Sequence, residues 1–225
     1  MYNDRTSIYK NSQFDFVLDQ TSSQRRTYDR ACVGDLVKAV VDVSLHLMIR
    51  FQGYHATVFA YGQTGSGKSF TMEGYKYKMN EKGEPVPILT EFNNYTKTPP
   101  SHMQDNDGLV PRAIHHLFDM IKQQNNLQKK KFTVYCSYLQ VYKEKIYDLL
   151  NKATVKRIAN DAPGLKLRWN KYDHFTVENL YTFECRSPED VMALYHFGIK
   201  NKVVASHAMN NQSSRSHTML SITVE

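Results

Sequence analysis

The stretch GQTGSGKS at Gly62 to Ser69 constrains the fold of this 225-residue chain more than any other feature. It fits the pattern G-x-x-x-x-G-K-[ST], in which glycines let backbone N–H groups close around phosphate oxygens. The preceding segment ATVFAY, residues 56–61, is a continuous apolar run of strand length, and a helix is expected to start near Gly67. A buried strand, a glycine-rich turn and a helix are the context that a phosphate-binding loop requires.

The chemistry expected of this loop is local. Successive N–H groups of residues 65–68 can point at a β-phosphate, and the following helix adds roughly half a positive charge at its N-terminus. Lys68 then neutralises phosphate oxygens, while the Ser69 hydroxyl is placed to bind Mg²⁺. The candidate phosphate-binding residues are Gly62, Gln63, Thr64, Gly65, Ser66, Gly67, Lys68 and Ser69.

Composition places the chain among globular proteins of one domain or most of one, with 41% hydrophobic residues. Its three cysteines form no C-x-x-C pair, which suits a reducing cytosol. No apolar run approaches the roughly 20 residues that cross a bilayer, and the first residues lack the apolar centre of a signal peptide, so an intracellular protein without a membrane span is expected. The net charge of +7 favours an acidic partner, which nucleic acid, an anionic membrane or an acidic protein surface would each satisfy.

Several helices and strands are predicted from periodicity. Helical spacing of apolar residues extends from Val33 to Phe51, and GLVPRA at residues 108–113 opens another helix. Between them, residues 75–106 are polar, contain four prolines and predict a long surface loop, with disorder the favoured interpretation. Residues 131–142 predict a long strand, and a short helical piece is expected near residues 145–150.

The last third of the chain continues the alternation. Two or three short strands are predicted within residues 165–183, and Ser187 is the N-cap of a helix expected to end near Gly198. The final residues, MLSITVE, again resemble a strand. We therefore predict an α/β P-loop NTPase fold with a central, mostly parallel or mixed sheet and helices on both faces.

The stretch NNQSSRSH at residues 210–217 makes the pattern specific. Together with the glycine-rich loop it resembles the kinesin motor domain, and further matching stretches are FDFVLD at 14–19, GLVPRA, and YLQVYKEKIYDLL at 138–150. Taken alone, SSRS is an ordinary polar turn. The resemblance covers residues 1–225 except the long loop, and it implies ATP as the ligand.

The resemblance also implies roles for individual residues. Ser213 and Ser214 would be the switch I hydroxyls, Ser213 facing the γ-phosphate and Ser214 the Mg²⁺ ion. Asn210 would position that segment, and Arg215 would pair with a glutamate of switch II. The implied catalytic set is Lys68, Asn210, Ser213, Ser214 and Arg215, the implied metal ligands are Ser69 and Ser214, and Phe70 and Tyr54 resemble the aromatic residues that border the adenine or are core filler.

Departures from the family pattern accompany the matches. The switch II motif Asp-Leu-Ala-Gly-Ser-Glu and the upstream Arg-x-Arg-Pro strand do not occur in this sequence. Lys202 stands where an arginine is usual, so the two-pronged fork of a guanidinium is lost, and His207 replaces a usual threonine. We expect the N-terminal larger part of a kinesin motor domain, inactive in hydrolysis by itself.

The expected function is Mg-ATP hydrolysis coupled to movement along, or regulated binding of, microtubules in the cytoplasmic cytoskeleton. Candidate tubulin contacts are Lys166, Arg168, Lys171 and His174. Dimerisation would use regions outside this chain, and the resemblance does not choose between axoneme and spindle. One alternative is a non-motile structural microtubule protein without efficient turnover. Another is a nucleic-acid-binding P-loop protein, which the lack of a basic patch with interleaved aromatics disfavours, so no nucleic-acid partner is expected.

Overall fold

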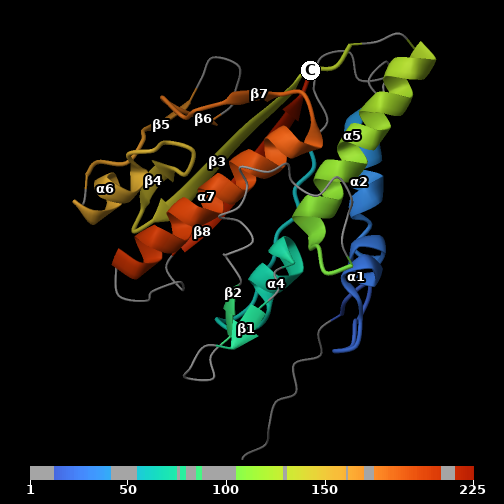
Figure 1. The fold of residues 1–225 in the computed structure, drawn as a ribbon, viewed down its shortest axis with the longest axis horizontal. Coiled ribbons are helices and arrows are strands. Elements are labelled where there is room, and N and C mark those ends of the chain that lie inside the picture. The colour runs from blue at the N-terminus through green and yellow to red at the C-terminus, as the bar shows by residue number, and fades with distance from the viewer. Residues whose placement is uncertain are drawn as a thin grey trace, which may run out of the picture.

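The chain forms a mixed α/β fold in a computed structural model that describes residues 13–41, 55–74, 77–79, 85–87, 105–128, 131–160, 162–169, 175–208 and 216–225 (Figure 1). Its helices are α1 (Gln24–Arg30), α2 (Val33–Val41), α4 (Lys68–Glu73), α5 (Leu109–Gln128), α6 (Thr154–Ala159) and α7 (Pro188–Ala208). Its strands are β1 (Tyr77–Met79), β2 (Pro85–Pro87), β3 (Val134–Tyr142), β4 (Lys145–Asp148), β5 (Leu167–Trp169), β6 (Phe175–Val177), β7 (Phe183–Cys185) and β8 (Ser216–Val224).

Strand β3 is the centre of the main sheet. Along one edge it pairs with β8 over its whole length, from Val134↔Val224 to Tyr142↔Ser216. Along the other edge it pairs first with β7 and then with β4. All these pairings are antiparallel, as are those of β1 with β2 and β5 with β6. The prediction of a mostly parallel sheet is therefore wrong for the described strands, because β4, β7 and β8 each run antiparallel to β3, and only β4 follows it through a tight hairpin.

The core lies between one face of this sheet and the helices α7, α5 and α2. Alternate residues of β3, Val134, Cys136 and Tyr138, are buried against apolar side chains such as Ile114 of α5 and Val191 of α7. Figure 1 shows α7 lying across β3 and β8, with α5 and α2 beyond it. On the opposite face of β8, Met219 is 58% exposed. Helices on both faces were predicted, but the described helices cover one face of the described sheet.

The apolar run before the glycine-rich loop is not a strand in the structure. Residues 56–61 have no secondary structure and are exposed, with Phe59 80% and Tyr61 95% accessible. A strand needs a neighbour to pair its N–H and C=O groups. No described strand pairs with this segment, so β-branched and aromatic composition alone does not produce one.

The segment predicted as a short helix near residues 145–150 is instead strand β4, which pairs with β3 in a tight hairpin. The two connecting residues, Lys143 and Glu144, both have positive φ angles, 48° and 61°. That conformation matches the twist of paired strands and usually recruits Asn or Gly. Because neither residue type is present here, the turn left no signal in the sequence.

The predicted helix after Ser187 is confirmed at its start and is longer than expected. The Ser187 hydroxyl accepts a hydrogen bond from the Asp190 N–H at 3.2 Å, as an N-cap does. Gly198 does not end the helix, which continues to Ala208. A Cβ at Gly198 would lie 2.2 Å from the Tyr138 ring, so this glycine permits close packing of α7 on β3.

Other predictions are confirmed in part. The GLVPRA stretch opens α5, and the strand predicted over 131–142 is β3. The short strands predicted within residues 165–183 are β5 and β6, while β7 begins at Phe183. The helix predicted from Val33 is described to Val41, and its remainder lies outside the described residues. The predicted long loop contains the antiparallel pair of β1 and β2, so it is not wholly irregular.

Candidate functional site

The glycine-rich loop has the backbone expected of a phosphate cradle at two of its glycines. Gly65 and Gly67 have φ angles of 82° and 86°, which side chains strongly disfavour. A Cβ built on either residue meets no atom within 4 Å, so the surface above them is open. Gly67 caps helix α4, which begins at Lys68. The Ser66 N–H donates to the Gln63 carbonyl at 3.2 Å, which tightens the turn.

The Lys68 side chain folds back over the loop. Its ammonium group donates hydrogen bonds to the carbonyl oxygens of Gly62 and Gln63, both at 2.6 Å. The lysine is half-buried, while Ser69 and Phe70 beyond it are exposed. The loop therefore places a cation above its own backbone, where phosphate oxygens could replace the two carbonyls as its partners.

Helix α4 is held by side chains from two other helices, through contacts that sequence reasoning missed. The amide of Gln24 in α1, which is buried, donates to the Phe70 carbonyl at 2.8 Å. At the last residue of α4, the Glu73 carboxylate accepts from Lys202 of α7 at 3.3 Å, and these side chains are 10% and 25% exposed. Neither contact has a sequence signal, because the paired residues lie 46 and 129 positions apart.

The Glu73 carboxylate is close to a second buried polar group. Burial first, and the Glu73 charge second, raise the pKa of the Tyr138 phenol above its usual value. Tyr138 belongs to β3 and also packs against Tyr195 of α7, with ring centroids 5.7 Å apart. The phenol therefore stays neutral at physiological pH. Lys202 is the charged partner described for Glu73.

Five of the site residues named from the sequence lie outside the described residues, namely Tyr54, Asn210, Ser213, Ser214 and Arg215. Their predicted roles stay predictions. The elements that flank the SSRS segment are described: α7 ends at Ala208 and β8 begins at Ser216. Because α7 is joined to α4 through Lys202, the helix entering this segment is tied to the helix that leaves the glycine-rich loop.

The predicted tubulin-contacting region is a separate, exposed hairpin of β5 and β6. Arg168 forms an ion pair with Glu178 at 2.9 Å, and Lys166 is exposed. Lys171 and His174 lie outside the described residues. The sole tryptophan, Trp169, stacks edge-on against Phe175 with centroids 4.6 Å apart, and both are more than half exposed.

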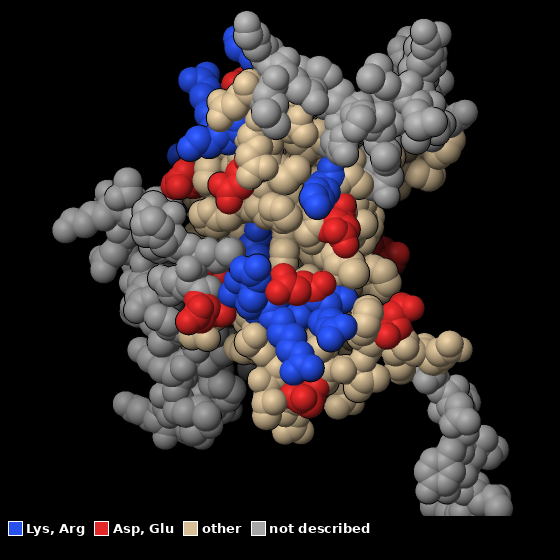
Figure 2. Space-filling model, turned by 90° about the vertical axis from the view of Figure 1, so that its right-hand side faces the viewer, with Lys and Arg blue, Asp and Glu red and all other residues tan. Residues whose placement is uncertain are grey.

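Charges of both signs are interspersed on the face that Figure 2 presents, on the side of α2 and α5. On α1, Arg25 and Asp29 form an exposed ion pair at 3.0 Å. An unbroken basic field of the kind that binds a nucleic-acid backbone is not seen on the described part of this face. Among the helices that the structure describes, none is long and apolar enough to cross a bilayer.

Fold and site together define a mixed α/β protein with a glycine-rich loop leading into a helix. Residues 2–225 match the kinesin motor domain, and the chain belongs to that family. It is 33% identical over 217 residues to kinesin-like protein KLP1 of Chlamydomonas reinhardtii, covering 95% of this chain and 22% of that protein. It is 32% identical over 225 residues to kinesin-related protein 5 of Dictyostelium discoideum, covering 99% of this chain and 19% of that protein.

A solved structure shows the same fold. A fast kinesin, whose structure was described with regard to its ATPase mechanism and microtubule interactions, superposes with a TM-score of 0.69 at 27% identity. The match covers 95% of this chain and 48% of that one. The chain thus spans about a fifth of the length of the curated relatives and about half of the solved one. Kinesin motor domains bind nucleotide and microtubules and are microtubule-stimulated ATPases.

Proposed function

We propose that this chain is the nucleotide-binding part of a microtubule motor domain of the P-loop NTPase class, and that Mg-ATP binds in the loop from Gly62 to Ser69. The observation that carries the proposal is the loop itself, with open space over Gly65 and Gly67 and the Lys68 ammonium at the carbonyl oxygens of Gly62 and Gln63. Kinesin family membership supports ATP as the nucleotide.

Two residues of the loop and the residue that follows it have separate roles in this proposal. Lys68 exchanges the carbonyls of Gly62 and Gln63 for phosphate oxygens, which costs little because charge-assisted hydrogen bonds are formed in place of those lost. The Ser69 hydroxyl is exposed at the first turn of α4 and supplies an oxygen ligand to Mg²⁺. Phe70, 46% exposed, is available to border the base.

The segment at residues 210–217 would complete the site from the other side. Ser213 would bind the γ-phosphate and Ser214 the Mg²⁺ ion, while Asn210 and Arg215 would position them. ATP then supplies a phosphoryl group that an oriented water accepts, with catalysis through positioning and charge stabilisation. The longer protein would use this reaction to move along, or to regulate its grip on, microtubules of the cytoskeleton.

The contact of Lys202 bears on the non-motile alternative. Lys202, in place of an arginine, was expected to lack the two-pronged fork of a guanidinium, and it forms an ion pair with Glu73 through its ammonium at 3.3 Å. The exposed hairpin carrying Lys166 and Arg168 supports an acidic partner such as tubulin under both alternatives. Nucleotide turnover by the longer protein distinguishes them, since only a motor requires microtubule-stimulated phosphate release.

Nucleotide binding is tested by titrating the chain with a fluorescent ATP analogue in the presence of Mg²⁺. Lys68→Ala should weaken binding at least ten-fold, because charged hydrogen bonds contribute about 1.5–3 kcal/mol. Lys152→Ala removes an equal charge from an exposed position next to α6 and is the matched control. Equal affinities of the wild type, Lys68→Ala and Lys152→Ala proteins would refute a nucleotide site at this loop.

A further inference from the structure

Helix α1 has one buried face, and two side chains on that face reach two different helices. Gln24 and Tyr28 are its buried residues, and because they are four positions apart they share one side of the helix. The Tyr28 hydroxyl is hydrogen-bonded to His116 of α5 at 2.9 Å, and the Gln24 amide donates to the Phe70 carbonyl of α4 at 2.8 Å. Helix α1 therefore connects α4 with α5, which also contact each other directly.

The Phe70 carbonyl is held by two donors. It accepts the Gly74 N–H at 2.9 Å, which closes the end of α4, and it accepts the Gln24 amide from α1. Gln24 is 6% exposed, so water has little access to replace it as a partner. A buried amide keeps its partner because losing the hydrogen bond leaves a desolvated polar group. The backbone of Phe70 is thereby fixed from outside its own helix.

The contacts described for the phosphate-binding lysine, in contrast, stay within the glycine-rich loop. The Lys68 ammonium donates to the carbonyls of Gly62 and Gln63 and not to any group of α1. A change at Gln24 should therefore leave these loop contacts in place. What it should change is the position of Phe70, two residues beyond the lysine.

The Phe70 side chain is the part of α4 that is open to a base. Its ring is 46% exposed and leaves the first turn of α4, next to the loop. The stacking of two aromatic systems depends on their offset and relative orientation. A ring whose backbone is fixed before the ligand arrives loses less conformational freedom on binding, which raises affinity.

We propose that Gln24 is a positioning residue of the nucleotide site, which holds Phe70 in the orientation that borders the nucleobase. This role rests on the proposed function, the binding of Mg-ATP at residues 62–69. Gln24 acts through the Phe70 backbone and needs no contact with the nucleotide itself. Affinity for the base then depends on α1, whereas affinity for the phosphates does not.

Isothermal titration calorimetry with Mg-ATP and with Mg-tripolyphosphate, which has three phosphates but no base or sugar, separates the two contributions. The wild type should bind ATP about ten-fold more tightly than tripolyphosphate, as stacking of one base allows. Gln24→Met keeps the length of the side chain but removes the amide. It should weaken ATP binding about five-fold and change tripolyphosphate binding less than two-fold.

Tyr28→Phe is the matched control, since it removes the other hydrogen bond of α1 and leaves that of Gln24 in place. It should change the affinity for ATP less than two-fold. Phe70→Ala should show the same split between ATP and tripolyphosphate, whether or not α1 tolerates a change at Gln24. Because Gln24 acts through Phe70, the double variant should bind ATP no more weakly than Phe70→Ala alone.

Equal losses of ATP and tripolyphosphate affinity in Gln24→Met, with the fold checked by circular dichroism, would overturn the role of Gln24. So would an equal loss of ATP affinity in Tyr28→Phe, additive losses in the double variant, or an unchanged affinity for ATP in Phe70→Ala. An unchanged affinity for ATP in Gln24→Met would refute this role and leave the nucleotide site standing. A wild type that binds neither ligand would refute the nucleotide site itself, and the role of Gln24 with it.

Discussion

Breaking the ion pair between Glu73 and Lys202 should destabilise the chain measurably. The pair joins the last residue of α4 to α7, and its side chains are 10% and 25% exposed. Lys202→Met keeps most of the aliphatic stem but removes the ammonium, so the Glu73 carboxylate loses this partner in a mostly desolvated place. Glu73→Gln removes the opposite charge while keeping the shape of the side chain.

The magnitude follows from the partial burial. Removing one partner of a fully buried pair costs about 3–5 kcal/mol, and exposed pairs contribute roughly 0–1 kcal/mol. The distance of 3.3 Å is at the long end for a hydrogen bond, which argues for a value between these limits. We expect Lys202→Met to lower the free energy of unfolding by about 2 kcal/mol, and to lower Tm by about 4–8 °C for a chain of this size.

The assay is urea unfolding of the wild type, Glu73→Gln, Lys202→Met and the double variant, followed by far-UV circular dichroism. The coupling energy from this double-mutant cycle should be about 1–2 kcal/mol. The exposed pair of Arg25 and Asp29, with side chains 67% and 55% accessible, is the matched control. Its cycle should give about 0.5 kcal/mol or less.

A coupling energy for Glu73 and Lys202 no larger than that of the exposed pair would refute the reasoning. Lys202→Arg is a further check, because a guanidinium can donate two hydrogen bonds to the same carboxylate. It should keep or increase the stability of the wild type. A large loss on Lys202→Arg would show that the space around Glu73 does not admit the fork.

Three further predictions concern α7 and the cysteines. Gly198→Ala should lower the free energy of unfolding in urea by about 1–3 kcal/mol, since its Cβ would lie 2.2 Å from an atom of the Tyr138 ring. A stabilised variant would contradict that packing. Native protein should react with Ellman's reagent at exposed Cys32 alone, because burial raises the pKa of Cys136 to about 12 and that of Cys185 to about 11. Fast reaction of all three thiols would contradict the burial of Cys136 and Cys185. Burial lowers the pKa of His196 from 6.5 to about 4, so the unfolded chain binds the proton first as pH falls, and stability should decline between these values by up to roughly 1.4 kcal/mol per pH unit. His196→Gln should flatten that part of the urea-denaturation profile, and an unchanged profile would assign the decline to other groups.

Helix starts were predictable because their signals are local. Ser187 followed by Pro and acidic residues marks the beginning of α7, and GLVPRA marks that of α5. The end of α7 was not predictable from Gly198, because the reason for that glycine is the Tyr138 ring on another element. A glycine that permits close packing has the same sequence signal as one that ends a helix.

Strand pairing was harder to predict than strand composition. Residues 56–61 have the composition of a buried strand, yet no described strand pairs with them and they stay exposed. Strand β4 forms because a turn of two residues with positive φ places it beside β3, although Lys143 and Glu144 are not typical of such turns. Pairing depends on neighbours that single-sequence periodicity does not reveal.

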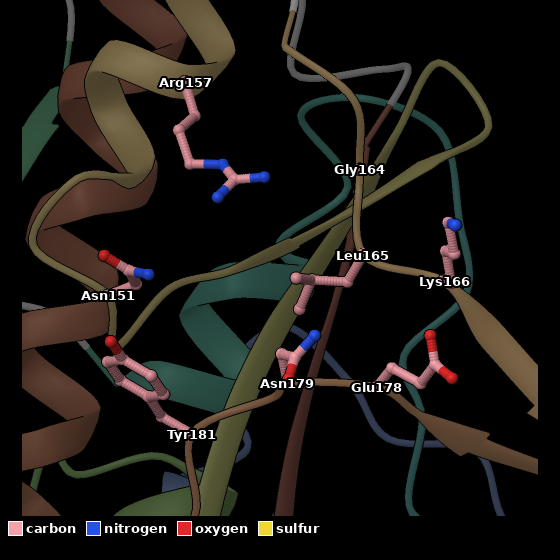
Figure 3. Close-up of a pocket in the computed structure, with 8 residues that line it drawn as sticks. All are labelled: Asn151, Arg157, Gly164, Leu165, Lys166, Glu178, Asn179 and Tyr181. Carbon is pink, nitrogen blue, oxygen red and sulfur yellow. The ribbon is translucent and has the colours of Figure 1, made fainter.

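The candidate site likewise has parts that the sequence predicted and parts that it did not. The glycine-rich loop was found from its spacing, since the backbone conformation at Gly65 and Gly67 is itself a requirement for glycine. The contacts of Glu73 with Lys202 and of Gln24 with Phe70 were not, because they join distant parts of the chain. The cavity between α6 and the β5–β6 hairpin (Figure 3) is likewise lined by residues from segments that have no shared motif.

The central proposal is that a triphosphate is held between the loop at residues 62–69 and the segment at residues 210–217. Hydrogen exchange measured by mass spectrometry, with and without a non-hydrolysable Mg-ATP analogue, tests it most directly. Peptides from both segments should gain protection together in the wild type and neither should gain it in Lys68→Ala. Protection confined to other parts of the chain, or protection of both segments that survives Lys68→Ala, would contradict the proposal.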